Sequence, residues 1–205
     1  MCRSNVSCLS KLLPASSAVY QLNLLSFQLS PLPSLGTPRR DAGIAKVNNR
    51  IYVFGGADAA KHNLRSCEKI DLSEKRWTSI GSMTHFRGSF TPCHFRSLLY
   101  LVACWVSSPV ETFNPERDTF AVLSVSLPRQ LTFGGGSVSF VVNEELCVLT
   151  DEKQMLRWKI DAEREFRLSI TEKVMWSNQQ PRILGSQLLI ACQGQVMQFS
   201  LETIQ

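Results

Sequence analysis

The chain has 205 residues, which is enough for one substantial hydrophobic core or two small ones. Hydrophobic residues make up 44% and charged residues 19% of the chain, and this composition excludes an extensively disordered protein. The net charge of +5 is spread along the chain, and no apolar run approaches the roughly 20 residues that span a bilayer. We therefore expect neither a nucleic-acid partner nor a membrane.

The chain contains seven cysteines, which is an odd number, and it has no Cys-x-x-Cys motif. Most of them lie within apolar, strand-like stretches, where a free thiol behaves as a small hydrophobic side chain. We therefore predict a protein of a reducing compartment, assigned to the cytoplasm, with neither a disulfide framework nor a zinc site.

Residues 1–17 are rich in serine and contain no acidic residue. Two interpretations stay open, a frayed N-terminal tail and an organelle transit peptide, of which we favour the tail. The next segment, 18–38, predicts two strands, one over Val19 to Leu22 and one over Phe27 to Leu29.

The densest pattern lies between residues 39 and 86. The turn Asn48-Asn49 precedes a β-branched and aromatic run, Ile51 to Phe54, which is too short for an ordinary helix and predicts a buried strand. Gly55-Gly56 follows it, which suits a strand end where neighbouring backbone leaves no room for a Cβ. The flanking segments predict three further strands, over 42–47, 67–72 and 76–80.

This pattern recurs three times downstream. In the first recurrence, Tyr100 stands in the place of Tyr52, and Ala103-Cys104 replaces the glycine pair. Further strands are predicted over 98–102, 137–142, 146–149, 158–161, 166–168, 188–190 and 196–201. The positions that correspond to Gly55 in the four copies are 55, 103, 150 and 191, and the intervals between them are 48, 47 and 41 residues.

The hydrophobic strand ending in two glycines is followed by Glu68, Ile70 and Asp71, and by Trp77 six residues after the aspartate. This ordered set resembles the kelch repeat, whose length of about 50 residues agrees with the spacings. The second copy keeps a weaker form of the motif in Glu111, Thr112, Phe113, Asn114 and Phe120.

The resemblance implies an all-β fold, a kelch-type β-propeller built from four-stranded antiparallel blades. We expect residues 1–17 to be a tail and 18–205 to be the propeller domain. Complete blades are predicted over 39–86, 87–129 and 130–178, and partial blades over 18–38 and 179–205. The propeller is thus predicted to be incomplete, with about four blades, and a four-bladed ring joined by its two ends is the alternative. An open arc exposes two sheet edges, so we also expect self-association through these edges.

Few patterns point to catalysis. The three histidines lack metal-ligand spacing, the triplet Gly134-Gly135-Gly136 lacks the following Lys-Ser/Thr of a phosphate-binding loop, and no Gly-x-Ser-x-Gly occurs. The copper site of a kelch-fold oxidase cannot be assembled from the three tyrosines, which we interpret as packing residues. We therefore predict no catalytic residue, no cofactor, no metal and no enzyme. The alternative is a carbohydrate or small-molecule enzyme of kelch fold, of the isomerase or oxidase type.

Loops that join second to third strands, and loops that join blades, share one face of a propeller, and loops on a rigid scaffold carry function. Arginine and tryptophan are frequent interface hot spots, so we predict that this face binds a protein or an acidic peptide. The predicted binding residues are Arg39, Arg40, Lys61, His62, Arg65, His85, Arg87, Trp105 and Arg129. A structural role within the propeller is the alternative for Arg39 and Arg87, and packing on its own blade is the alternative for Trp105.

The resemblance implies that the chain is a scaffold or substrate-recognition module rather than an enzyme. A degenerate product without activity is a third interpretation.

Overall fold

The computed structural model describes residues 14–23, 25–88, 90, 92–102, 110–123, 138–142, 145–149, 155–159, 168–170, 182–184, 187–192 and 195–200. The regular elements in these ranges are β-strands, as the sequence predicts. No helix of the described ranges is long and apolar enough to cross a membrane.

Three four-stranded antiparallel sheets follow one another along the chain, and in each the strands pair in chain order. The first sheet contains β3 (Gly43–Val47), β4 (Arg50–Phe54), β5 (Cys67–Asp71) and β6 (Arg76–Ile80). The second contains β7 (Cys93–Phe95), β8 (Leu98–Leu101), β9 (Glu111–Asn114) and β10 (Thr119–Val122). The third contains β11 (Val138–Val142), β12 (Glu145–Leu149), β13 (Met155–Lys159) and β14 (Leu168–Ile170). These are the four-stranded antiparallel sheets expected of kelch blades.

Two smaller sheets lie at the two ends of the chain. The first is the hairpin of β1 (Val19–Leu22) and β2 (Leu29–Leu32). The second contains β15 (Arg182–Leu184), β16 (Gln187–Cys192) and β17 (Gln195–Ser200). Within the described ranges they are separate sheets, with no strand pairing between them.

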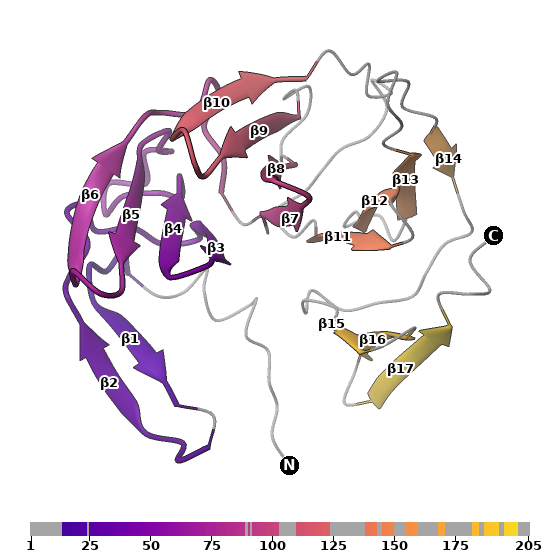
Figure 1. The fold of residues 1–205 in the computed structure, drawn as a ribbon, viewed down its shortest axis with the longest axis horizontal. Coiled ribbons are helices and arrows are strands. Elements are labelled where there is room, and N and C mark those ends of the chain that lie inside the picture. The colour runs from indigo at the N-terminus through magenta and orange to yellow at the C-terminus, as the bar shows by residue number, and fades with distance from the viewer. Residues whose placement is uncertain are drawn as a thin grey trace.

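Figure 1 shows the sheets arranged around a common centre, with β3, β7 and β11 on the inside and β6, β10 and β14 on the periphery. The inner strands contact each other from sheet to sheet, β3 with β7 and β7 with β11. The first strand of each sheet is thus the innermost and the fourth the outermost, as in a propeller blade.

Successive sheets match residue for residue in their register. Tyr52 pairs with Ala45 and Lys69, and Tyr100 pairs with Cys93 and Thr112, so the two tyrosines occupy the same place in consecutive sheets. This confirms that the sheets are copies of one unit.

The structure corrects two details of the predicted strands. In the third sheet, the third strand is Met155–Lys159, whereas the sequence predicts a strand over 158–161. Apolar alternation indicates that a strand is present but does not fix the residue at which it begins. In the hairpin, Phe27 precedes β2 and has a left-handed backbone with φ of 54°.

An aromatic core fills the space between the first two four-stranded sheets. Phe54 and Phe113 meet edge to face with their ring centroids 5.4 Å apart, and Phe120 lies 4.8 Å from Phe113. The hydroxyl of Tyr52 donates a hydrogen bond of 3.1 Å to the carbonyl of Pro115 on the neighbouring sheet. These rings belong to one buried hydrophobic cluster, which includes residues of both sheets.

The residue at the Asp position of the motif accepts hydrogen bonds from the backbone of the turn between the third and fourth strands. The Oδ1 atom of Asp71 accepts a hydrogen bond from the backbone N–H of Ser73, and Oδ1 of Asn114 accepts one from that of Glu116. In the hairpin, Oδ1 of Asn23 accepts hydrogen bonds from the backbone of the following turn in the same way. Asp and Asn recur here because a short acceptor side chain replaces a backbone turn bond.

Candidate interaction face

Backbone hydrogen bonds within the β4–β5 loop, residues 55–66, and from this loop to neighbouring segments hold it in place. Ala57 exchanges two backbone hydrogen bonds of 2.9 Å with Arg40, and the N–H of Leu64 donates to the carbonyl of Gly56 at 2.8 Å. The N–H of Met83 donates to the carbonyl of Arg65 at 3.0 Å, which ties this loop to the segment that leads into the second sheet. These hydrogen bonds hold the backbone of the loop in one conformation.

The tip of this loop presents basic side chains to solvent. Lys61, His62 and Arg65 are exposed, and Arg40 is half-buried at the base of the loop. The Nη1 atom of Arg65 donates a hydrogen bond of 3.3 Å to the carbonyl of Thr84 on the adjoining segment.

Asp58 is the acidic residue of the loop tip, and the loop itself uses its carboxylate. One carboxylate oxygen accepts a hydrogen bond of 2.8 Å from the backbone N–H of His62, and the other lies 3.1 Å from the Nδ1 atom of the same residue. The hydrogen bond from the His62 backbone is the main reason why the pKa of Asp58 lies below its usual value of 3.8. Both carboxylate oxygens of Asp58 thus contact His62 within the loop.

An exposed aromatic side chain lies on the segment that Arg65 contacts. Phe86 follows His85 on the segment that borders the loop, and its side chain is 46% exposed. We use the name basic loop face for Arg40, Lys61, His62, Arg65, His85 and Phe86. Sequence reasoning missed Phe86, because the sequence does not show which of the eleven phenylalanines are exposed.

Two of the arginines predicted to bind a partner are buried. Arg39 is 5% and Arg87 is 0% exposed, and each forms an ion pair with the glutamate of its own repeat, at 2.6 Å to Glu68 and 2.8 Å to Glu111. Arg39 also donates hydrogen bonds to the carbonyls of Gly55 and Ser66. Their guanidinium groups therefore hold the sheet together rather than face a partner, which corresponds to the structural alternative considered for them.

The remaining predicted residues differ in position. His85 is half-buried, and its Nδ1 atom is buried without a hydrogen-bond partner in the described part of the chain. Trp105 and Arg129 lie outside the described residues, as does the glycine triplet 134–136.

The described side chains bear on two kinds of reactive site, metal sites and thiolate nucleophiles. No group of three His, Cys, Asp or Glu residues that could hold a metal ion occurs among them. Burial raises the pKa of the Cys67 and Cys93 thiols to about 12, so neither supplies a thiolate nucleophile near neutral pH.

Comparison with protein families identifies a Kelch motif at residues 38–84. This range contains the whole β3–β6 sheet, the buried pair of Arg39 and Glu68, and Trp77. No curated protein matches the chain.

Proposed function

We propose that the chain is a kelch-type interaction module that binds an acidic peptide, or an acidic surface of another protein, through the basic loop face. The observation that carries this proposal is the hydrogen-bonded loop 55–66, which presents Lys61, His62 and Arg65 to solvent and contacts, through Arg65, the segment that exposes Phe86. Cations on a hydrogen-bonded loop, together with an aromatic anchor on the adjoining segment, favour an acidic partner with an apolar side chain.

The rigidity of the loop supports binding because a preorganised surface loses little conformational entropy on association. Arg39 and Arg87 are left out of the proposed surface, since both guanidinium groups are engaged within the sheet. Cys67 and Cys93 are free and buried, which supports assignment of the module to the cytoplasm.

The test is binding of a fluorescent acidic 15-residue peptide that contains phenylalanine, compared with a peptide in which every acidic residue is replaced by the neutral amide. We expect the acidic peptide to bind more tightly, and its affinity to decrease with added salt. The double variant Lys61→Glu, Arg65→Glu is expected to weaken binding by about tenfold or more. Arg117→Glu, an exposed charge reversal on the β9–β10 turn, is the matched control. Equal affinity of both peptides, or of the double variant and the wild type, would refute the proposal.

The alternative function, an isomerase or oxidase of kelch fold, has no supporting arrangement among the described side chains. It makes a separate prediction: the wild-type protein would convert a member of a panel of free sugars. Turnover that persists in the Lys61→Glu, Arg65→Glu variant would favour the enzyme over the interaction module.

A further inference from the structure

A cavity of about 520 Å³ lies beside the β3–β6 sheet, and none of its lining residues belongs to the basic loop face. One wall is the segment 33–37, which follows β2, and the other is formed by Lys75, Arg76 and Trp77. Arg39 and Glu68 lie at its inner end. We call it the Trp77 cavity. Its volume falls within the range of about 300 to 1,000 Å³ that is typical of small-molecule sites.

The cavity exists because the sheet on this side of β3–β6 is smaller than a complete blade. Between the first two four-stranded sheets, the corresponding space is filled by the rings of Phe54, Phe113 and Phe120. Phe120 stands in the motif position of Trp77, but Trp77 faces the two-stranded β1–β2 hairpin and its exit segment instead. Among the described residues, Trp77 thus meets a hairpin of two strands, where Phe120 meets a four-stranded sheet.

Both walls are fixed to the rest of the protein. The indole Nε1 of Trp77 donates a hydrogen bond of 2.7 Å to the carbonyl of Pro33, which sets the orientation of the ring. The carboxylate of Glu68 accepts hydrogen bonds from the backbone N–H groups of Gly36 at 2.7 Å and Thr37 at 3.2 Å. A ligand would meet a preformed site, which lowers the entropic cost of binding.

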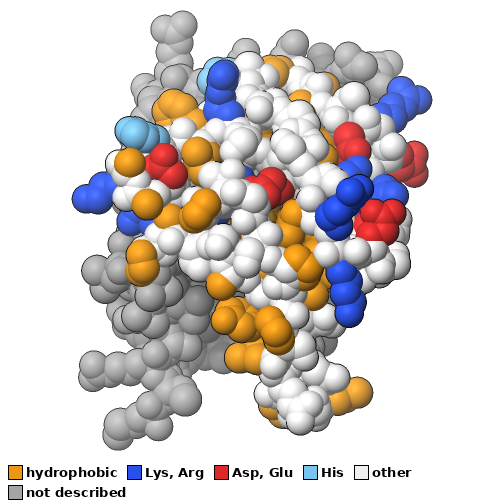
Figure 2. All heavy atoms as spheres, turned by 90° about the vertical axis from the view of Figure 1, so that its left-hand side faces the viewer, with side chains coloured by type: hydrophobic (Ala, Val, Ile, Leu, Met, Phe, Trp, Pro, Cys, Tyr) orange, Lys and Arg blue, Asp and Glu red, His pale blue; other side chains and the backbone are white. Residues whose placement is uncertain are grey.

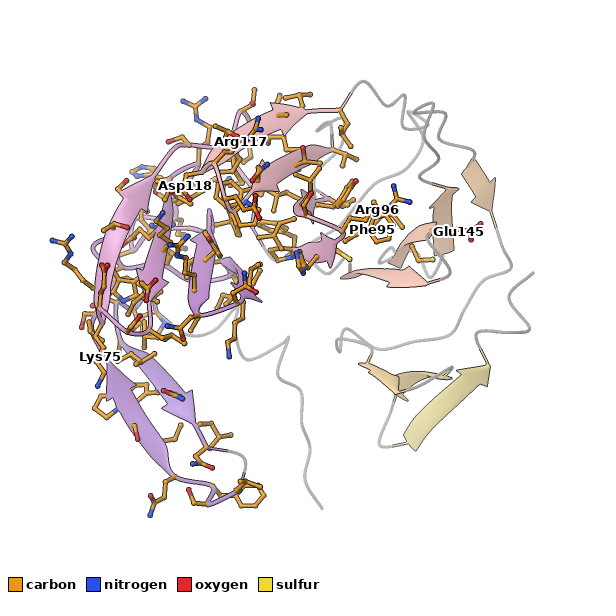
Figure 3. All side chains as sticks on the ribbon, in the orientation of Figure 1. Lys75, Phe95, Arg96, Arg117, Asp118 and Glu145 are labelled. Atoms are coloured by element: carbon orange, nitrogen blue, oxygen red, sulfur yellow. The ribbon has the colours of Figure 1, made fainter. Side chains whose placement is uncertain are left out.

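The charges around the cavity favour an anion. Arg39, Lys75 and Arg76 line it against a single acidic residue, Glu68, and the ion pair of Arg39 with Glu68 cancels one positive charge. Lys75 and Arg76 are exposed at the rim, and a backbone hydrogen bond of 2.8 Å from Lys75 to the carbonyl of Asp71 fixes the turn that carries them. Figure 3 shows Lys75 at the lower end of the β3–β6 sheet, whereas Arg117 and Asp118 lie on the β9–β10 turn of the next sheet.

We propose that the Trp77 cavity binds a small organic phosphate. Its ring lies against the indole of Trp77 inside the cavity, and its phosphate group lies between Lys75 and Arg76 at the rim. Two adjacent cations match the double charge of a phosphate monoester, and an aromatic wall accepts the apolar face of a sugar or the face of an aromatic ring. This proposal does not rest on the function proposed for the basic loop face.

The first experiment is isothermal titration of the wild-type protein with phenyl phosphate, glucose 6-phosphate, inorganic phosphate, phenol and glucose. We expect one of the two ring phosphates to bind at least about tenfold more tightly than inorganic phosphate and than its uncharged counterpart. Tighter binding of phenyl phosphate would identify an aromatic source and tighter binding of glucose 6-phosphate a sugar source, and both results support the site. Binding of inorganic phosphate as tight as that of both ring phosphates, or binding of none, would overturn the proposal.

The second experiment locates the bound phosphate in the fold. In the variant Lys75→Gln, Arg76→Gln, both changes are at exposed side chains, so the fold is expected to persist and the affinity to decrease by about tenfold. Arg117→Gln, on the equivalent turn of the next sheet, is expected to bind as the wild type does. Quenching of indole fluorescence by the ligand is expected to disappear in Trp77→Phe. Unchanged affinity in the double variant would overturn the proposed location, even if the wild type binds the ligand.

Discussion

Glu68 and Glu111 occupy the same place in consecutive sheets, and both receive a buried arginine and two backbone N–H groups. The N–H donors belong to the segment just ahead of the arginine, at Gly36 and Thr37 in one sheet and at Thr84 and His85 in the next. Each glutamate thereby ties the segment that enters a sheet to the third strand of that sheet. A buried charge pair of this kind persists only when its remaining hydrogen-bonding atoms are also satisfied.

Removal of the charge of Glu111 is therefore expected to destabilise the folded protein strongly. The side chains of Glu111 and Arg87 are both 0% exposed, so Glu111→Gln leaves a buried guanidinium without its anion. We expect the free energy of unfolding to decrease by about 3 to 5 kcal/mol, measured by urea denaturation. Glu116→Gln, at an exposed position of the following turn, is the control and should change it by less than about 0.5 kcal/mol. Equal stability of the two variants would contradict a structural role for the pair.

The same carboxylate predicts a dependence of stability on pH. Burial alone would raise the pKa of Glu111, but hydrogen bonds from Thr84 and the neighbouring charge of Arg87 outweigh it and hold the pKa below 4.5. Because the folded-state pKa is lower than the unfolded one, the stabilisation is complete above pH 4.5 and is lost as the pH falls through the folded-state value. The difference in unfolding free energy between wild type and Glu111→Gln should therefore shrink below pH 4.5. A constant difference down to pH 3 would exclude this carboxylate as the cause.

At the scale of the element, the strand that ends in Gly55-Gly56 depends on close contact between backbones. Gly55 has φ of +59° and Gly56 has φ of +90°, both in the left-handed region that glycine tolerates. A Cβ on Gly55 would lie 2.3 Å from the carbonyl oxygen of Arg87 and 3.0 Å from that of Leu64. The glycine pair thus allows the loop of one sheet to touch the segment that enters the next.

Gly55→Ala is expected to reduce the free energy of unfolding by about 2 to 4 kcal/mol, since left-handed strain and steric overlap add. Gly81→Ala is the matched control, because its Cβ would make only an ordinary contact of 3.5 Å with the ring of Phe120. We expect Gly81→Ala to be neutral or slightly stabilising in thermal denaturation. A loss of stability in Gly81→Ala as large as in Gly55→Ala would contradict this explanation.

At the scale of the whole molecule, the β1–β2 hairpin is the most exposed apolar part of the described chain. Leu25 is 94%, Phe27 78% and Leu29 66% exposed, and the hairpin is a sheet of only two strands. Figure 2 looks at this side of the molecule and shows hydrophobic side chains gathered at its lower centre, with Lys and Arg at both margins. Unpaired strand edges beside apolar side chains favour association.

We therefore expect the protein to associate with itself in a concentration-dependent manner in analytical ultracentrifugation. Phe27→Ser combined with Leu29→Ser should shift the equilibrium towards the monomer, because both side chains are exposed on the hairpin. Ile44→Ser, which replaces an exposed apolar side chain on the inner strand β3, is the control. A protease-resistant wild type that stays monomeric at every concentration would rule out association through the hairpin.

Much of this organisation follows from the sequence alone. Local turn residues and the alternation of apolar side chains define each strand of the first sheet, because both signals depend on residues a few positions apart. The repeated spacing then relates each sheet to the next, and Tyr52 and Tyr100 do occupy matching places. Lys61, His62 and Arg65 could be assigned to a loop for the same reason.

Only the tertiary structure decided which cations remain at the surface. Arg39 and Arg87 are buried because of glutamates 29 and 24 residues further along the chain, and no local pattern shows that such a pair forms. The exposure of Phe86 and the cavity beside Trp77 likewise depend on what the neighbouring sheet provides. A sequence determines strands through contacts between near neighbours, whereas burial and cavities arise from packing between segments that are distant in the chain.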